Sequence, residues 1–442
     1  MVWHTIEIGG ILMFQSIELQ QGIHLHIRPT DQFKTVNFSF KFKQGLTNQS
    51  ASERSVLANV LVHSNELFPS NPAFRSHLDE LYGTILYLDS NKKGSHHNIT
   101  LLAETVNDQY LSTDGVLDQV LNLLQTVLFR PNLEQGAFKE SIVNREKESV
   151  IQRIESLYDD KTRYAQQRLM ELLRPNHPAS IGANGTIDDV TAITKESLFD
   201  AYKKMLEEDE LEIYVVGDVD VEEMTSKLKA AFPFTARNVK PKDLHKDVEH
   251  PPITENVVNE YQEMKQGKLH IGYETNVTFT HPDFPKMQIT NGIFGGYPHA
   301  KLFLNVREKE SMAYYVSSSF SSAYGLLFVL AGIDSSKQEK AVRLIDEQLN
   351  AMKNGEISQN EIDQTVAMLK NQLKEALDSA RGQIEIFDQY KDLDETFTVE
   401  AWVAKWATVT KEDVQEMAKS INKQLVYFLS GKEEMTHEGA SL

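Results

Sequence analysis

Arg307 and Tyr314 are the two residues whose types and spacing point most clearly to chemistry. They are the first and last residues of a segment that reads Arg-Glu-Lys-Glu-Ser-Met-Ala-Tyr. A separation of seven residues is about two α-helical turns, so both side chains point the same way if the segment is helical. A guanidinium and a phenol on one face can donate hydrogen bonds to a peptide carbonyl or an oxyanion. An arginine in surface ion pairs and a core tyrosine would give the same spacing without any function.

The composition is that of a globular protein and narrows the choice of partners. The chain has 442 residues, of which 40% are hydrophobic and 25% charged, and its net charge is −19. This charge argues against nucleic acids and anionic membranes, which bind positive surfaces. There is no cysteine, which excludes disulfides, thiol catalysis and cysteine-based zinc sites and fits a reducing compartment. No apolar run is long enough to span a membrane and the N-terminus does not read as a signal peptide, so we expect a cytoplasmic location.

The chain contains an internal repeat. Thr194 and Thr410 each begin a Thr-Lys-Glu triplet, and the two triplets are 410 − 194 = 216 residues apart. In both places the threonine is a natural N-cap for a helical stretch, and a strand-like apolar run follows, at residues 211–217 and 425–431. The repeat predicts two halves of similar fold.

Each half is predicted to be an α+β unit, with a mostly antiparallel sheet and helices packed on one face as an α/β sandwich. Strands are expected at Val36–Phe42 and Lys268–Thr275, and an amphipathic helix at Val116–Leu128. A long charged helix should follow in each half, at about 133–173 and about 359–390. The predicted domains are 1–235 and 263–442, joined by a polar, proline-containing linker at 236–262, and the two halves would form a clamshell.

The segment around Arg307 resembles the C-terminal half of the insulinase-like (pitrilysin-type) zinc peptidases, in particular the mitochondrial-processing-peptidase branch. That family has the pattern G-G-x-x-S-R-L-F followed by R-E-K-x-G-L-A-Y and a strand. Here Gly295–Phe303 reads Gly-Gly-Tyr-Pro-His-Ala-Lys-Leu-Phe, which keeps the spacing but replaces the serine. The similarity extends over nearly the whole chain from about Phe14. Met13 is therefore a candidate start, and residues 1–12 a candidate unstructured extension.

The resemblance also shows that the family's zinc residues are replaced. An active member carries H-x-x-E-H on a helix in its first half and a distal glutamate on a later helix. Here the five motif positions become 55–59, with Ser55 and Asn59 where the histidines would stand. The distal position falls on Arg153, with Glu155 as an alternative. The sequence therefore predicts no metal site and no cofactor.

Other histidines do not offer an evident replacement. The fragments that begin at His63 and His77 read H-x-x-E, but both lack the closing histidine. The pair at 96–97 lies at the start of a predicted strand, where neighbours face opposite sides. His24 and His26 can share a strand face, but no carboxylate is close in sequence, so we expect both at the surface.

Some enzymes of this family are heterodimers in which one subunit has lost zinc but keeps the Arg/Tyr pair. The resemblance therefore implies a non-catalytic subunit that pairs with a zinc-bearing homologue and contributes Arg307 and Tyr314 to the binding of a peptide substrate. Such a subunit would have no peptidase activity alone. One alternative is a stand-alone peptide-binding or structural scaffold of the same fold, which could self-associate. A second is an active metallopeptidase with an unorthodox site.

Overall fold

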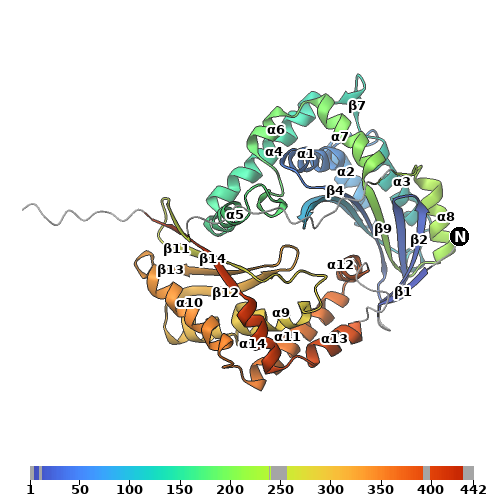
Figure 1. Cartoon of the computed structure of the whole chain (residues 1–442). Coiled ribbons are helices and arrows are strands. Elements are labelled where there is room, and N and C mark those ends of the chain that lie inside the picture. Colours follow the sequence, from blue (N-terminus) through green and yellow to red (C-terminus); the bar gives the residue numbers. More distant parts are fainter. Residues whose placement is uncertain (1–3, 9–11, 238, 240–255, 392–398, 432–442) are drawn as a thin grey trace, which may run out of the picture. The chain divides into compact units, whose positions relative to one another are not determined.

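The computed structural model describes the chain except for residues 1–3, 9–11, 238, 240–255, 392–398 and 432–442 (Figure 1). The chain divides into two compact units. Unit 1 consists of residues 1–156, 181–247 and 373–401, and unit 2 of residues 157–180, 248–372 and 402–442. Each unit therefore includes a short segment from the opposite half of the sequence.

Unit 1 contains a seven-stranded sheet in the order β1-β2-β3-β9-β4-β6-β5. Only β3 and β9 run parallel, and the other neighbours are antiparallel. The strands are β1 (His4–Ile8), β2 (Leu12–Gln20), β3 (Ile23–Pro29), β4 (Thr35–Gly45), β5 (Ile85–Lys93), β6 (His96–Val106) and β9 (Glu210–Gly217). β7 (Leu133–Glu134) and β8 (Ala137–Phe138) form a separate small hairpin.

Unit 2 contains a five-stranded sheet in the order β10-β14-β11-β13-β12. Its strands are β10 (Val257–Tyr261), β11 (Gly267–Glu274), β12 (Ala313–Ser321), β13 (Leu326–Ile333) and β14 (Asn422–Ser430). β10 and β14 are the parallel pair. This order matches β3-β9-β4-β6-β5 of unit 1 strand for strand, so the predicted duplication is present in the topology.

Helices connect the strands in both halves of the sequence. In the first half they are α1 (Asn48–His63), α2 (Asn71–Glu80), α3 (Val116–Phe129), α4 (Glu140–Asp159), α5 (Lys161–Leu173), α6 (Ile187–Ala192), α7 (Lys195–Glu208) and α8 (Val221–Ala231). In the second half they are α9 (Phe284–Asn291), α10 (Gln338–Lys353), α11 (Gln359–Leu377), α12 (Ala380–Tyr390), α13 (Val399–Ala407) and α14 (Lys411–Ser420), with the π-helical segments η4 (Gly292–Gly296) and η5 (Leu302–Lys309) after α9. Three-residue 3₁₀ turns lie at Asp108–Tyr110, Pro178–Ser180 and Ser335–Lys337.

The two predicted N-caps are present at equivalent places in the two halves. Thr194 caps α7 and Thr410 caps α14, and each forms a reciprocal capping box with the residue three positions on. α7 is followed by β9, which pairs in parallel with β3, and α14 is followed by β14, which pairs in parallel with β10. The two triplets therefore begin the same element in each unit.

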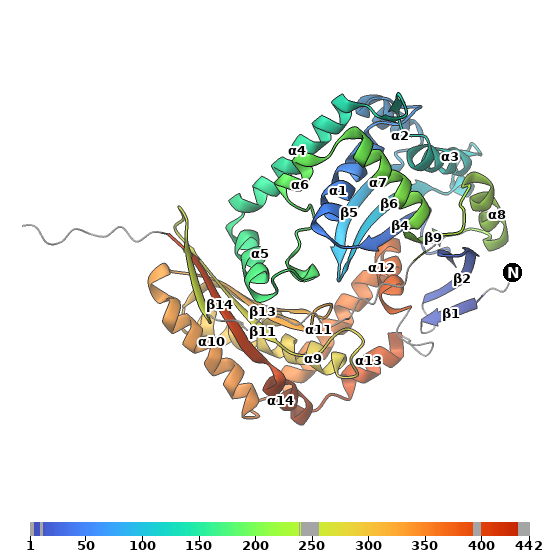
Figure 2. The same ribbon diagram turned by 45° about the horizontal axis from the view of Figure 1, so that its top comes forward.

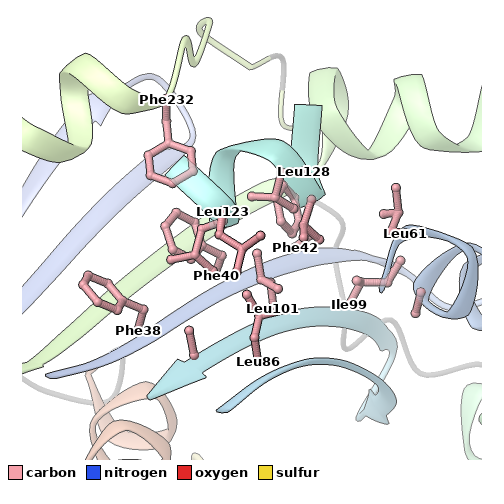
Figure 3. Close-up of a cluster of buried hydrophobic side chains, with 14 of the residues drawn as sticks. Phe38, Phe40, Phe42, Leu61, Leu86, Ile99, Leu101, Leu123, Leu128 and Phe232 are labelled. Carbon is pink, nitrogen blue, oxygen red and sulfur yellow. The ribbon is translucent and has the colours of Figure 1, made fainter. Parts of the chain in front are cut away.

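The apolar core of unit 1 lies between one face of the sheet and the helices that cover it (Figure 3). The alternation in β4 places Val36, Phe38, Phe40 and Phe42 in this core, all at most 1% exposed. They pack with apolar residues of the covering helices, such as Leu123 of α3. Burial of each such aromatic side chain contributes roughly 1.5–3 kcal/mol.

Three details differ from the prediction. The helix expected at about 133–173 begins only at Glu140, because the preceding residues form the β7–β8 hairpin. Each expected long helix is also split in two, because Asp160 caps α5 and Ser379 caps α12 by accepting hydrogen bonds from backbone N–H groups. The candidate unstructured extension also contains β1, which pairs antiparallel with β2. The N-terminal part of that expectation was therefore wrong for residues 4–8.

The predicted linker at 236–262 is partly outside the described residues. Arg237 is 1% exposed, and its Nη1 donates to the backbone oxygens of Met205 and Asp209 at 3.0 and 2.5 Å. The last part of the predicted linker, Val257–Tyr261, is strand β10.

The fold class is confirmed, and the structure adds one helix to the second face of each sheet. In unit 1 this helix is α12, and in unit 2 it is α5 (Figure 2). α5 packs through an apolar cluster that includes Leu169 and Leu173. Gly272 of β11 permits this close approach, because a Cβ there would lie 3.0 Å from Leu173.

The contact of α12 with unit 1 is polar and deeply buried. Asp388 of α12 accepts hydrogen bonds from Lys41 at 2.8 Å, Lys93 at 3.0 Å and the Tyr214 hydroxyl at 2.6 Å. Lys43 lies 3.3 Å from the same carboxylate. Although burial opposes ionisation, the neighbouring lysines hold the pKa of Asp388 well below its ordinary value.

We predict that Asp388→Asn will lower the stability of the protein by about 3–5 kcal/mol, because it leaves the buried Lys41 with the half-exposed Glu385 as its remaining counter-charge. Glu385→Ala is the matched control: Glu385 lies 3.5 Å from the same lysine, but its side chain is 49% exposed, so its loss should cost less than about 1 kcal/mol. Urea unfolding of both variants measures this difference. Because the pKa of Asp388 is lowered, its contribution should be complete at neutral pH and lost as the pH falls below the ordinary aspartate pKa. Equal stability of the two variants would contradict the assignment.

Candidate functional site

The positions that would hold zinc lie on α1, and the side chains at these positions make hydrogen bonds within the protein. Ser55 is fully buried, and its hydroxyl donates to the backbone oxygen of Ala183 at 3.2 Å. The Oγ of Ser90 lies 3.5 Å from the same hydroxyl. Asn59, one helical turn further on, presents its Oδ1 to the guanidinium of Arg153 at 3.5 Å.

Arg153 stands where a distal carboxylate would be needed. Its Nη2 contacts Asn59 and its Nη1 lies 3.5 Å from Asn184 Oδ1. The structure therefore brings Arg153 to the α1 site. A hydroxyl, an amide and a guanidinium do not fit zinc, which takes imidazole, thiolate or carboxylate ligands.

The histidines of the two H-x-x-E fragments do not form a replacement site. His63 pairs with Glu146 of α4 at 3.2 Å, whereas Glu66 pairs with Arg130 at 2.7 Å. His77 lies 3.5 Å from Glu80 and stacks on a phenylalanine ring. The two fragments therefore make separate local contacts.

His97 is fully buried, and both of its ring nitrogens have hydrogen-bond partners. Arg54 of α1 donates to its Nδ1 at 3.3 Å, and its Nε2 lies 2.9 Å from the backbone oxygen of Ala183. Burial lowers the pKa of His97 to about 4, so the ring is neutral at physiological pH. We assign it a structural role next to α1.

The expectation that His24 and His26 are surface residues without a carboxylate was wrong. His26 is 4% exposed, and its Nε2 lies 2.6 Å from Glu212 of β9, while His24 Nδ1 lies 3.5 Å from the same carboxylate. The parallel pairing of β3 with β9 brings Glu212 beside both histidines. Burial lowers the pKa of His26, whereas the neighbouring Glu212 raises that of His24.

His24, Glu210 and Glu212 have ligand atoms close enough together to hold a cation. Two lysines already supply positive charge at this point: Lys391 donates to Glu212 at 3.0 Å, and Lys43 lies 3.7 Å from it. A divalent cation would have to displace these ammonium groups. We therefore interpret the cluster as part of the attachment of α12 to the sheet.

The structure brings Arg307 and Tyr314 together, but not along one helix. Arg307 lies in the π-helical segment η5, which ends at Lys309, and Tyr314 is the second residue of strand β12. The chain turns between them at Ser311, which has a left-handed conformation with φ 47°. The family pattern has glycine at this position, which is the residue that adopts such a backbone without steric cost.

Both side chains are accessible and line one open depression of about 410 Å³. The Tyr314 residue is 67% exposed and the Arg307 side chain 40% exposed. The guanidinium lies 4.7 Å from the ring centre of Phe303 and 3.6 Å from Glu308. Arg307 is thus steadied by its own helical segment without being enclosed in a buried ion pair.

The depression offers hydrogen-bond donors beside groups of both charges. Besides Arg307 and Tyr314 it is lined by Glu308, Asp334 and Lys337. A guanidinium and a phenol can bind a peptide carbonyl or carboxylate. Among the described residues that line this depression there is no histidine–carboxylate or serine–histidine arrangement.

Comparison with known proteins agrees with this picture. A family described as "Peptidase M16 inactive domain" matches residues 192–369. A Bacillus subtilis protein described as "Probable inactive metalloprotease YmfF" is 41% identical over 414 residues, which cover 93% of this chain and 96% of that protein. The chain belongs to the M16 peptidase family. This is the insulinase-like superfamily that the Gly295–Tyr314 region indicated.

A solved structure and a second relative are also similar to this chain. The crystal structure of a conserved protein from Enterococcus faecalis V583 has a TM-score of 0.89 and 34% identity, and covers 95% of this chain and 99% of that one. An uncharacterized zinc protease of Bacillus subtilis, YmxG, is 23% identical over 63% of this chain and 69% of its own length. In the described part of the M16 chain, no helix is long and apolar enough to cross a membrane.

We predict that the purified protein retains less than about 0.1 zinc per chain after dialysis, because Ser55, Asn59 and Arg153 supply no zinc ligand at the family position. Inductively coupled plasma mass spectrometry measures the content. A stable value near one zinc per chain would show that another ligand set exists. His63→Ala and His24→Ala would then show whether the ion is held by His63 and Glu146 or by His24, Glu210 and Glu212.

Proposed function

We propose that this chain is a zinc-free subunit of an M16 peptidase of the processing-peptidase type. It has no peptidase activity alone and pairs with a zinc-bearing homologue. Its own contribution is the Arg307/Tyr314 surface, which binds the peptide substrate and helps to orient it. The observation that carries the proposal is the contrast between the blocked α1 site and the accessible Arg307 depression.

The α1 site supports the non-catalytic half of the proposal. Ser55 is engaged with Ala183, and Arg153 lies against Asn59. Zinc catalysis needs a water-binding metal and a nearby general base, and these positions offer neither. A guanidinium at the distal position would also repel a cation electrostatically.

The depression in unit 2 supports the binding half. Arg307 and Tyr314 remain accessible even though the surrounding Met312 and Ala313 are buried. An exposed arginine and tyrosine contribute little to folding, so the shared accessible surface is better explained by a ligand than by stability.

The relatives support the pairing. Bacillus subtilis encodes both YmfF, described as a probable inactive metalloprotease, and a similar protein described as a zinc protease, YmxG. Inactive-type and zinc-type relatives therefore coexist in one organism. We infer that the present chain acts beside such a zinc-bearing relative.

The test is reconstitution with a zinc-bearing M16 homologue from the same organism. Cleavage of an unfolded peptide should be absent with this chain alone and present with the pair. Arg307→Ala should lower kcat/KM of the pair by an amount that corresponds to about 2–4 kcal/mol of lost transition-state stabilisation, because it removes a charged donor that holds the substrate. Tyr314→Phe should have a smaller effect, since it removes one hydroxyl and keeps the ring.

Lys309→Ala is the matched control, because Lys309 is an exposed cation on the same segment but does not line the depression. The control should leave kcat/KM of the pair unchanged. If the pair is active and Arg307→Ala is indistinguishable from Lys309→Ala, the shared-site role is rejected. A chain that binds peptides equally well without any partner would support the scaffold alternative instead.

A further inference from the structure

The outer edge of β10 is an unfilled strand position in unit 2. β10 is the last strand of its sheet, and in the described part of the chain no strand pairs with its outer side. The corresponding strand of unit 1, β3, is paired there with the antiparallel strand β2. The same topology therefore accepts a further strand in unit 1 at the place where unit 2 ends.

The backbone of β10 presents hydrogen-bonding groups at this edge. The Val426 amide donates to the backbone oxygen of Asn256 at 2.8 Å, and the Gln262 amide donates to that of Ser430 at 2.9 Å. Because peptide groups alternate in direction along a strand, the N–H and C=O of Val257, Asn259 and Tyr261 point to the outer side. Such an edge is a template for strand addition.

A groove of about 500 Å³ runs between β10 and α10, beside this edge. Its apolar lining is formed by Val257, Val342 and Val426. Val257 is 52% exposed, which is high for a valine in a sheet. In unit 1, β2 contributes Ile17 to the apolar core, and Leu19 packs against that core.

The charge of the groove selects its occupant. Of its charged lining residues, Glu339, Asp346 and Glu347 are acidic and only Arg343 is basic. Arg343 lies 3.7 Å from Glu347, and Lys423 forms an ion pair with Asp346, so the four charged lining residues together with Lys423 carry a net charge of −1. A second copy of this chain, with a net charge of −19, would meet repulsion here.

The spacing of these charges matches an extended peptide. Glu339 and Glu347 are eight residues apart on α10, or about 12 Å at 1.5 Å per residue. Positions i and i+4 of a strand are separated by about 13 Å and face the same side. Two basic residues at these positions would therefore have about the same spacing as the two glutamates.

We propose that the groove between β10 and α10 binds an extended segment of another protein, added antiparallel to β10, with the pattern basic-x-aliphatic-x-basic. This function is independent of the Arg307 surface and of any zinc-bearing partner. It would give the protein a second peptide-binding site on unit 2.

The test uses the full chain and a fluorescein-labelled peptide, acetyl-Ser-Lys-Thr-Val-Thr-Lys-Ser-amide. Fluorescence anisotropy should show saturable binding that is at least tenfold tighter than that of the same peptide with glutamate in place of lysine. Glu339→Lys combined with Glu347→Lys should reverse this preference. Glu356→Lys combined with Glu412→Lys, which changes exposed acidic residues outside the groove by the same charge, should leave it unchanged.

Hydrogen exchange separates strand addition from simple charge attraction. The lysine peptide should slow exchange at the amides of Val257, Asn259 and Tyr261, and a peptide with N-methylated alternate amides should not. Equal binding of the lysine and glutamate peptides, or protection elsewhere, would overturn the proposal. So would strong protection of the three amides without peptide, because the edge would then already be covered by the chain itself or by a second copy.

Discussion

Unit 1 depends on the pairing of two buried carboxylates, Glu212 and Asp388, with lysine side chains on the polar face of its sheet. Asp388 comes from α12, in the second half of the sequence, and Glu212 from β9, in the first half. Removal of either charge would leave ammonium groups in the interior, which costs several kcal/mol per ion. This requirement explains why a helix distant in sequence is an integral part of unit 1.

The same charge pairing occupies side chains that could otherwise bind a metal. His26 and Glu212 are potential ligands by type, but they are used to satisfy each other and Lys391. On the other face, α1 is held by a hydrogen bond that Ser55 donates to Ala183 and by one that Asn59 accepts from Arg153. The positions that bind zinc in active relatives therefore have structural partners here, and the M16 fold persists around them. By contrast, the depression in unit 2 that Arg307 and Tyr314 line is accessible.

Much of the fold could be predicted from local patterns. The alternation in β4 and the N-caps Thr194 and Thr410 are signals carried by a few adjacent residues, and they gave the strands and the repeat correctly. The breaks at Asp160 and Ser379 were missed because a capping aspartate or serine inside a polar run looks like any other surface residue. The burial of His26 could not be predicted, since its partner Glu212 lies 186 residues away in sequence.

The candidate site was predicted in part, and for a different geometric reason. Arg307 and Tyr314 do share a surface, but the turn at Ser311 and the start of β12 bring them together, not two turns of helix. The family glycine at the Ser311 position was the available signal, because a conserved pattern with glycine there marks a left-handed residue that ends a helix. The alignment with the zinc motif placed Arg153 and Asn59 at two ligand positions, but it did not predict the contact that the structure shows between them.

The most direct measurement of the central claim is photo-cross-linking from position 314. A benzophenone amino acid is incorporated in place of Tyr314, and the chain is mixed with a substrate peptide with and without an inactivated zinc-bearing homologue. We predict that the peptide becomes covalently attached to this chain in the presence of the homologue, and much less so when the probe replaces Tyr110, which is exposed but does not line the Arg307 depression. Efficient peptide binding by the pair with no attachment from position 314 would contradict the account.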